Sequence, residues 1–161
     1  MKIYGLDRLA KKIENLKSKG KKIVLCHGCF DLMHPGHIKH FQSAKKMGDI
    51  LVVTVTPDIY VGKGESRPVF NETLRTESIA ALECVNFVAI NKWPTATETI
   101  KLLKPDIYVK GSEYEKGDET GRLQQEQKAL FEIGGKMCYT YDIVFSSTEL
   151  LNKYFLRNDE Q

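Results

Sequence analysis

Residues 23–56 read IVLCHGCFDLMHPGHIKHFQSAKKMGDILVVTVT, and they contain one complete repeat of an alternating pattern. The apolar run from Ile23 to Cys26 is typical of a strand that is buried on both faces. Residues 35–47 have the pattern of a helix, with a proline at the start and Gly48 after the end. Residues 50–56 are β-branched and apolar and predict a second strand. A strand, a helix and a strand in succession predict two parallel strands joined by a crossover.

The rest of the chain continues this alternation. Helices are predicted at residues 6–18, 72–83, 95–103 and 122–133 and from about residue 147, and strands at residues 87–91, 107–110 and 137–141. A capping box of Thr95 and Glu98 is expected to open one of these helices. The pattern therefore predicts a doubly wound α/β domain with a parallel, Rossmann-like sheet of five strands and helices on both faces. Ligands of such sheets bind at the carboxyl ends of the strands.

The length and composition indicate one domain. The 161 residues divide into an amphipathic helix within residues 1–20, a main domain at 21–156 and a short tail at 157–161. Apolar residues make up 42% and charged residues 28%, which argues against disorder. A net charge of +3 is too small to indicate nucleic-acid binding. Because no apolar run approaches the ~20 residues of a membrane span and no leader pattern opens the chain, we expect a cytoplasmic protein without a membrane partner.

All the histidines of the chain lie between Cys26 and His40. One interpretation is a zinc site made by Cys26, Cys29, His34 and His37, but the four residues between the two pairs are far fewer than zinc modules use. A second interpretation is a thioredoxin-like dithiol. The helix begins about six residues after Cys29, so the thiol would lack the helix N-terminus that lowers its pKa.

The third interpretation, which we favour, is phosphate binding. His34 and His37 share one face of the first helical turn, and Gly36 between them allows a ligand to approach the backbone closely. The free N–H groups and the positive end of the helix dipole also attract an anion. The structural alternative is that these histidines only cap and cover the helix end.

These residues also carry a resemblance to a known family. Gly28-Cys29-Phe30-Asp31 followed by His34-Pro35-Gly36-His37 resembles the GxFD…HxGH signature of the nucleotidyltransferase superfamily, which includes cytidylyltransferases and small-molecule adenylyltransferases. Further matches between Lys22 and Leu151 are Lys63-Gly64, Ser66-Arg67-Pro68-Val69, Arg75, Val109-Lys110-Gly111 and Phe145-Ser146-Ser147-Thr148. The pattern looks most like the bacterial D-glycero-β-D-manno-heptose 1-phosphate adenylyltransferase domain, which is often fused to a sugar kinase.

This resemblance implies that a phosphate oxygen of the acceptor attacks the α-phosphorus of ATP and expels pyrophosphate. It assigns catalytic roles to His34, His37 and Lys63, and substrate contacts to Lys63, Arg67, Arg75 and Glu113. The implied nucleotide-binding residues are Gly28, Cys29, Phe30, Asp31, His34, Gly36, His37, Lys110, Gly111, Ser146, Ser147 and Thr148. Mg²⁺ is expected as a cofactor, bound mainly through the triphosphate, with no protein ligand named.

Several of these residues also have a structural interpretation. Lys63 could be a solvated loop lysine, and Arg75 could pair with Glu72 or Glu77 on its own helix. Asp31 could orient the turn or contact the nucleotide. Residues 146–149 form a capping box as well as a phosphate-binding helix start.

The choice of nucleotide and acceptor depends on two departures from the glycerol 3-phosphate cytidylyltransferases. Residues 141–144 lack the arginine of those enzymes, and the Lys110-Gly111 ending is absent from them, so ATP is favoured over CTP. The acidic segment 113–120 is expected to form part of the acceptor pocket or a lid. A cytidylyltransferase for a small phosphorylated alcohol and a nucleotide-binding module without turnover remain alternatives. A homodimer and a separate or fused sugar kinase are the protein partners that the resemblance suggests.

Overall fold

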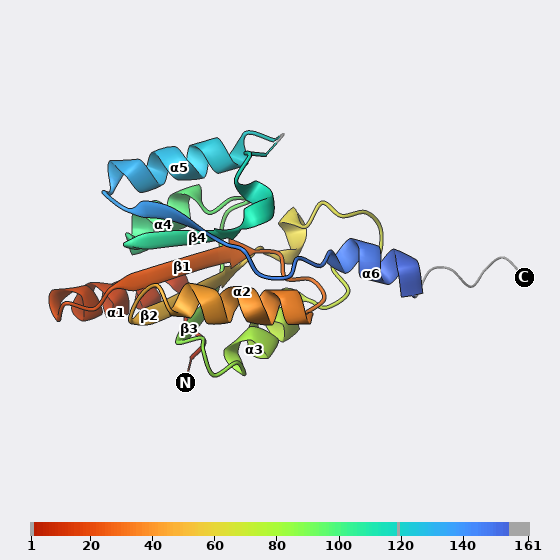
Figure 1. Cartoon of the computed structure of the whole chain (residues 1–161). Coiled ribbons are helices and arrows are strands. Elements are labelled where there is room, and N and C mark those ends of the chain that lie inside the picture. Colours follow the sequence, from red (N-terminus) through yellow and green to blue (C-terminus); the bar gives the residue numbers. More distant parts are fainter. Residues whose placement is uncertain (1, 119, 155–161) are drawn as a thin grey trace, which may run out of the picture.

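A parallel sheet with the strand order β3-β2-β1-β4-β5 forms the centre of the computed structural model, which describes residues 2–118 and 120–154 (Figure 1). The strands are β1 (Ile23–Gly28), β2 (Ile50–Val55), β3 (Phe87–Ile90), β4 (Ile107–Gly111) and β5 (Lys136–Thr140). The predicted doubly wound sheet of five parallel strands is confirmed. The predicted tail, residues 157–161, lies outside the described residues.

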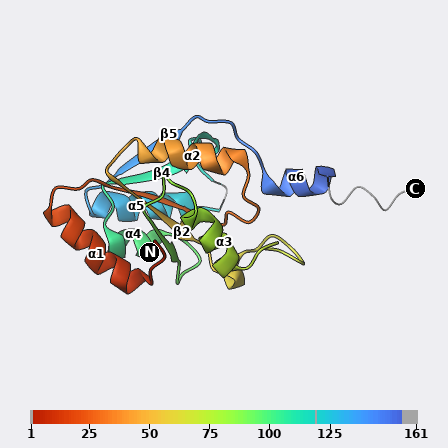
Figure 2. The same ribbon diagram turned by 90° about the horizontal axis from the view of Figure 1, so that it is seen from below.

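Helices cover both faces of the sheet, as Figures 1 and 2 show from two directions. The helices are α1 (Leu6–Ser18), α2 (Pro35–Lys45), α3 (Glu72–Ala80), α4 (Thr97–Leu103), α5 (Arg122–Glu132) and α6 (Ser147–Tyr154), with short 3₁₀ turns η1 (Asp58–Tyr60) and η2 (Ser112–Tyr114). Alternate residues of β1 enter different apolar clusters: Ile23 and Leu25 pack with α1, α4 and α5, whereas Val24 and Cys26 pack with α2 and α3. Burial on both faces explains the uninterrupted apolar strands of the sequence.

The N-terminal helix is part of this core. Leu6, Leu9 and Ile13 of α1 are at most 1% exposed and join the cluster with α4 and α5. The helical spacing of these side chains therefore predicts both the helix and its buried face correctly.

Several element boundaries differ from the sequence prediction by one to three residues; for example, α2 ends at Lys45 and α3 at Ala80. Two of the differences follow from tertiary contacts. β1 extends past Cys26 to Gly28, because His27 and Gly28 pair with Thr54 and Val55 of β2. The capping box predicted at Thr95 is wrong: α4 begins at Thr97, and its N-cap, Ala96, makes no side-chain cap. The backbone N–H of Ala96 donates instead to Glu126 of α5 at 3.0 Å.

The last helix differs from the others in its surroundings. Figures 1 and 2 both show α6 extending away from the sheet. Its first residue, Ser147, is anchored because the Oγ–H donates to the carbonyl of Leu32 in the β1–α2 loop at 3.0 Å. Within residues 2–118 and 120–154, none of the helices has the length and apolar character needed to cross a bilayer.

Candidate active site

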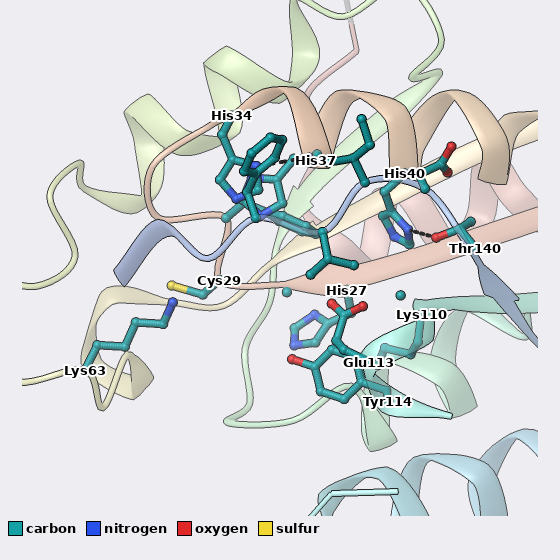
Figure 3. Close-up of a pocket in the computed structure, with 18 residues that line it drawn as sticks. His27, Cys29, His34, His37, His40, Lys63, Lys110, Glu113, Tyr114 and Thr140 are labelled. Carbon is teal, nitrogen blue, oxygen red and sulfur yellow. Dashed lines mark hydrogen bonds between the residues drawn. The ribbon is translucent and has the colours of Figure 1, made fainter. Parts of the chain in front are cut away.

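A cavity of about 230 Å³ lies at the carboxyl ends of β1 and β4, the strands on either side of the point where the winding direction reverses (Figure 3). Ligands of doubly wound sheets bind at such a point. The walls are completed by the first half of α2 and by the segment that follows β5. The cavity is lined by His27, Gly28, Cys29, Phe30, His34, Gly36, His37, His40, Lys63, Lys110, Gly111, Glu113, Tyr114, Thr140, Asp142, Ile143, Val144 and Phe145.

His34 caps the N-terminus of α2. Its Nδ1 accepts a hydrogen bond from the backbone N–H of His37 at 3.3 Å, and Pro35 occupies the first turn, where no N–H is needed. Because Nδ1 is the acceptor, the proton of the neutral ring is on Nε2. This Nε2–H is enclosed and has no acceptor among the described residues.

The rings of His34 and His37 stack, with centroids 3.7 Å apart and planes inclined by 18°. A side chain at Gly36 would disturb this arrangement, since a Cβ there would lie 2.9 Å from the carbonyl oxygen of Ile143 and 3.1 Å from the ring of His34. The glycine of the HxGH pattern is therefore required by close packing against the segment after β5.

Both stacked rings are neutral near pH 7 in the free protein. Burial lowers the pKa of His37 to about 3, and the positive charge of Lys63, together with the charges that His34 and His40 carry when protonated, acts in the same direction. Burial also lowers the pKa of His34, and the charge of Lys63 acts in the same direction. A neutral imidazole still carries one N–H group, which can donate a hydrogen bond to an anion.

Phe30, which follows the end of β1, packs against the histidine pair. Phe30 has a positive φ of 48°, which turns its ring edge-on to His37 at 5.2 Å and to Phe41 at 5.0 Å. A Cβ at Gly28 would lie 2.9 Å from the Phe30 ring, so the glycine makes room for it. The GxFD residues thus shape the floor under the histidine pair.

Asp31 orients the neighbouring loop. It is 1% exposed, and its two carboxylate oxygens accept from Arg67 Nε and from the Val69 N–H, each at 2.5 Å. Arg67 is therefore directed at Asp31, and neither residue lines the cavity. Of the two roles considered for Asp31, the structure supports orientation of the turn.

Lys63 lies in the loop that Asp31 and Arg67 hold. It is exposed and lines the cavity, and Figure 3 shows its ammonium group directed toward Cys29. Its charge is felt at the pKa values of both His34 and His37. The structure therefore brings Lys63 together with the histidine pair.

Arg75 is separated from the cavity. Its side chain is 1% exposed and donates to the carbonyls of Phe70 and Thr56 at 2.9 and 2.8 Å, to the carbonyl of Cys29, and to Asp58 at 2.6 Å. The predicted pairing with Glu72 or Glu77 is wrong, because Asp58 is the partner. Arg75 ties together the loops after β1 and β2.

Lys110 lies on the opposite wall, at the end of β4. It pairs with the buried Glu126 at 3.4 Å, and its ammonium group lies 5.1 Å from the ring centre of Tyr114. Glu113 follows on η2 and folds back, since a Cβ at Gly111 would lie 2.0 Å from its Oε2. Lys110, Gly111 and Glu113 all line the cavity.

The serine and threonine residues at the start of α6, Ser146, Ser147 and Thr148, do not line the cavity. Ser146 Oγ accepts from the Glu149 N–H at 3.3 Å, as the predicted capping box requires, and Ser147 holds Leu32. Thr148 is exposed.

Several lining residues were given no role by sequence reasoning: His27, His40, Thr140, Asp142, Ile143, Val144 and Phe145. His27 and His40 belong to the histidine cluster, which was the available signal. The residues at 140–145 directly follow the last strand, and their position at the carboxyl edge of the sheet could have indicated them.

The cysteines do not form a shared site. Cys26 packs in the apolar cluster under α2, where burial raises the pKa of its thiol, whereas Cys29 lines the cavity. Both are free thiols. In the described ranges, no group of three or more His, Cys, Asp or Glu side chains is arranged to hold a metal ion.

Comparison with known proteins places this geometry in a family. The profile of the cytidylyltransferase-like family matches residues 25–150. The bifunctional protein HldE of Citrifermentans bemidjiense is 46% identical over 123 residues, which are 75% of this chain and 25% of that protein. The chain thus spans about a quarter of the length of such curated relatives.

Solved structures agree with this match. A lipopolysaccharide core biosynthesis protein from Thermoplasma volcanium superposes with a TM-score of 0.65 and 30% identity, covering 78% of this chain and 100% of that one. A pantoate-beta-alanine ligase from Francisella tularensis, solved with ATP-related and beta-alanine ligands, shares the fold alone at a TM-score of 0.62 and 16% identity, covering 95% of this chain and 77% of that one. Gly28 and Phe30 of the GxFD pattern and His34, Gly36 and His37 of the HxGH pattern line one cavity. The chain belongs to the cytidylyltransferase-like family and so to the nucleotidyltransferases.

Proposed function

We propose that this chain transfers an adenylyl group from ATP to the phosphate of a sugar 1-phosphate of the heptose type and releases pyrophosphate. The observation that carries the proposal is the enclosed Nε2–H of His34, a donor without an acceptor at the N-terminus of α2. Buried polar groups are almost always hydrogen-bonded, so an unpaired donor beside a cavity needs an acceptor from a ligand. A phosphate oxygen is the acceptor that the helix dipole also favours.

The reaction requires no nucleophile from the protein. An oxygen of the acceptor phosphate bonds to the α-phosphorus while the bond to the oxygen that bridges to the β-phosphorus breaks, and pyrophosphate leaves with that electron pair. His34, His37 and the first N–H groups of α2 would stabilise the charge on the α-phosphate oxygens. Lys63 would hold the phosphates from the loop side, and the Asp31–Arg67 pair would keep that loop in place.

Mg²⁺, carried by the triphosphate and water, would supply charge neutralisation on the phosphates. Asp142 and Glu113 line the cavity without pairing to each other, and we assign neither as a ligand. We keep three residues at the start of α6 as proposed nucleotide contacts: Ser146, Ser147 and Thr148. They would contact the phosphates if the segment before α6 moved toward the cavity. Arg67 and Arg75 are proposed to support the substrate site through the loops that they hold.

The choice of acceptor is supported by the family resemblance and by the relatives. One solved relative is described as a lipopolysaccharide core biosynthesis protein, and the curated relatives are bifunctional proteins about four times as long as the match. We propose that a sugar kinase, fused or separate, supplies the phosphorylated sugar.

The test is pyrophosphate release with ATP or CTP over a panel of phosphorylated acceptors, including heptose 1-phosphate and glycerol 3-phosphate. The proposal expects release with ATP and a sugar 1-phosphate. Release only with CTP and a phosphorylated alcohol would indicate a cytidylyltransferase. Nucleotide binding without release over the whole panel would indicate a module without turnover.

A further inference from the structure

His40 is a third histidine on the cavity side of α2. It follows His37 by three residues, so it lies on the same side of the helix and about 4.5 Å further along the axis, at ~1.5 Å per residue. It lines the same cavity as His34 and His37, but the function proposed above gives it no task.

The ring of His40 is held in one orientation. Its Nδ1 and the hydroxyl of Thr140, at the buried end of β5, are 2.7 Å apart (Figure 3). Nε2 has no partner among the described residues. One nitrogen is thus committed to the protein and the other is available to a ligand, the arrangement expected of a hydrogen-bonding group that is fixed in advance.

The charges around His40 differ from those at the histidine pair. Asp142 and Glu113 both line the cavity, and the charge of Asp142 acts on the ring of His40. One oxygen of Asp142 is enclosed without a donor among the described residues. The positive charge of Lys110 is already paired with Glu126. Burial and Lys110 together lower the pKa of His40 to about 4, against the opposing effect of Asp142, so the ring is neutral near pH 7.

This mixture of charges is unsuited to a second phosphate. The carboxylates of Asp142 and Glu113 would repel an anion, whereas they and a neutral imidazole can exchange hydrogen bonds with hydroxyl groups. In a nucleoside triphosphate, the group next to the α-phosphate is the ribose. If His34 and His37 hold the α-phosphate, the ribose falls within one helical turn of them, where His40 lies.

We propose that His40 is a specificity-determining residue that hydrogen-bonds a ribose hydroxyl of the nucleotide through Nε2, with Thr140 as its positioning residue. The inference rests on the proposed function for the location of the α-phosphate. It adds that the protein recognises one of the two ribose hydroxyl groups, and that it does so from α2.

The first test uses the unaltered chain. Dissociation constants are measured by calorimetry for ATP, 2′-deoxy-ATP and 3′-deoxy-ATP, and kcat/KM for pyrophosphate release is measured in parallel. Loss of one hydrogen bond to a ligand corresponds to roughly a tenfold change, at 1.4 kcal/mol per factor of ten. We expect one of the two deoxy analogues to bind about tenfold more weakly than ATP. Equal affinity for all three nucleotides overturns the proposal.

The second test asks whether His40 is responsible. His40→Phe keeps a planar ring but removes both nitrogens. We expect the ratio of the affinity for ATP to that for the deoxy analogue to fall to about one, because the variant binds ATP more weakly but binds the deoxy analogue as before. Thr140→Val, which keeps the side-chain volume, should reduce the preference partly. Lys39→Ala, an exposed neighbour on the same helix, is the matched control and should leave the ratio unchanged.

The outcomes separate the two proposals. If His40→Phe weakens all three nucleotides equally, or changes only the response to acceptor hydroxyls, the assignment of His40 is wrong while adenylyl transfer stands. If the ratio in binding behaves as expected but no acceptor yields pyrophosphate, the assignment of His40 stands and the proposed reaction is wrong. Should His40→Phe fail to fold, as judged by circular dichroism, Thr140→Val and the deoxy analogues decide.

Discussion

The carboxylate of Asp31 is bound by Arg67, with the guanidinium Nε 2.5 Å from Oδ2 and the Val69 N–H on the other oxygen. This pair joins the β1–α2 turn to the loop that carries Lys63. The GxFD aspartate therefore acts at a distance from the proposed phosphate site, by holding the loop that carries Lys63.

Removing the charge of Asp31 should release the loop. In Asp31→Asn the charge-assisted hydrogen bonds, worth about 1.5–3 kcal/mol each, are lost or weakened. We expect trypsin to cleave after Lys63 at least tenfold faster than in the unaltered chain, and the KM for nucleotide to rise several-fold. Glu132→Gln, an exposed change on α5, is the control. Unchanged cleavage at Lys63 would show that the loop is held by other contacts.

The stacked histidines should be needed for turnover but not for folding. His37→Ala removes a ring whose enclosed Nδ1 has no partner among the described residues, so no side-chain hydrogen bond seen in this part of the chain is lost. We expect kcat to fall roughly a hundredfold or more, as for other single donors to a transition state, while the unfolding midpoint in urea changes little. His34→Ala should reduce kcat similarly and also destabilise α2 by about 1 kcal/mol, because it removes the cap. A His37→Ala variant with normal turnover would contradict the phosphate assignment.

Gradual acidification should destabilise the fold through its buried histidines. Burial lowers the pKa of His27 to about 3, well below the ~6.5 of an unfolded histidine. Between these values the unfolded chain binds a proton that the folded chain does not, so stability falls as the pH drops below about 6.5. His27→Asn should reduce the slope of unfolding free energy between pH 6 and 5 by up to about 1.4 kcal/mol per pH unit. Identical slopes in urea titrations of the two proteins would refute this.

Arg75 should prove structural. Arg75→Ala leaves the carbonyls of Phe70, Cys29 and Thr56 and the carboxylate of Asp58 without their donor. Because the Asp58 side chain is 35% exposed, we expect most of the cost to come from the carbonyls, at about 1–3 kcal/mol of unfolding free energy for each one left without a donor. Urea denaturation, with the exposed Arg122→Ala as control, measures this. A stable Arg75→Ala protein that has lost only acceptor binding would instead indicate a direct substrate contact.

Cys29 should be dispensable for chemistry. It lines the cavity as a free thiol, while Cys26 is buried in the core on the α2 side of the sheet. Cys29→Ala is therefore expected to keep pyrophosphate release within about threefold of the unaltered chain, in the presence or absence of a reducing agent. Complete loss of function would revive the redox interpretation.

The order of strands and helices could be predicted because β1 and β2 are short apolar runs buried on both faces and helices such as α1 show one apolar side. The histidine turn proposed to bind phosphate was also accessible, since His34, Gly36 and His37 are close in the sequence and their helical spacing places them together. Local pattern and local geometry agree in both cases.

The remaining parts of the site depend on contacts between distant residues. His40 and Thr140 are 100 positions apart, and no local sequence pattern predicts their hydrogen bond. Three of the acceptors of Arg75 are backbone carbonyls, which have no sequence signature. The capping box at Thr95 failed for the same reason, because Glu126 on another helix supplies the acceptor.

The close approach of Gly36 to the carbonyl of Ile143 has a consequence for the order of assembly. The histidine turn is synthesised before the segment that packs against it, which follows more than a hundred residues later in the chain. A growing polypeptide on the ribosome would therefore hold the two imidazoles, yet lack a finished nucleotide pocket until residues 140–147 had emerged and docked. Nucleotide affinity in this protein thus reports the completion of folding, and ligand-induced stabilisation should act most strongly on the last segment to arrive.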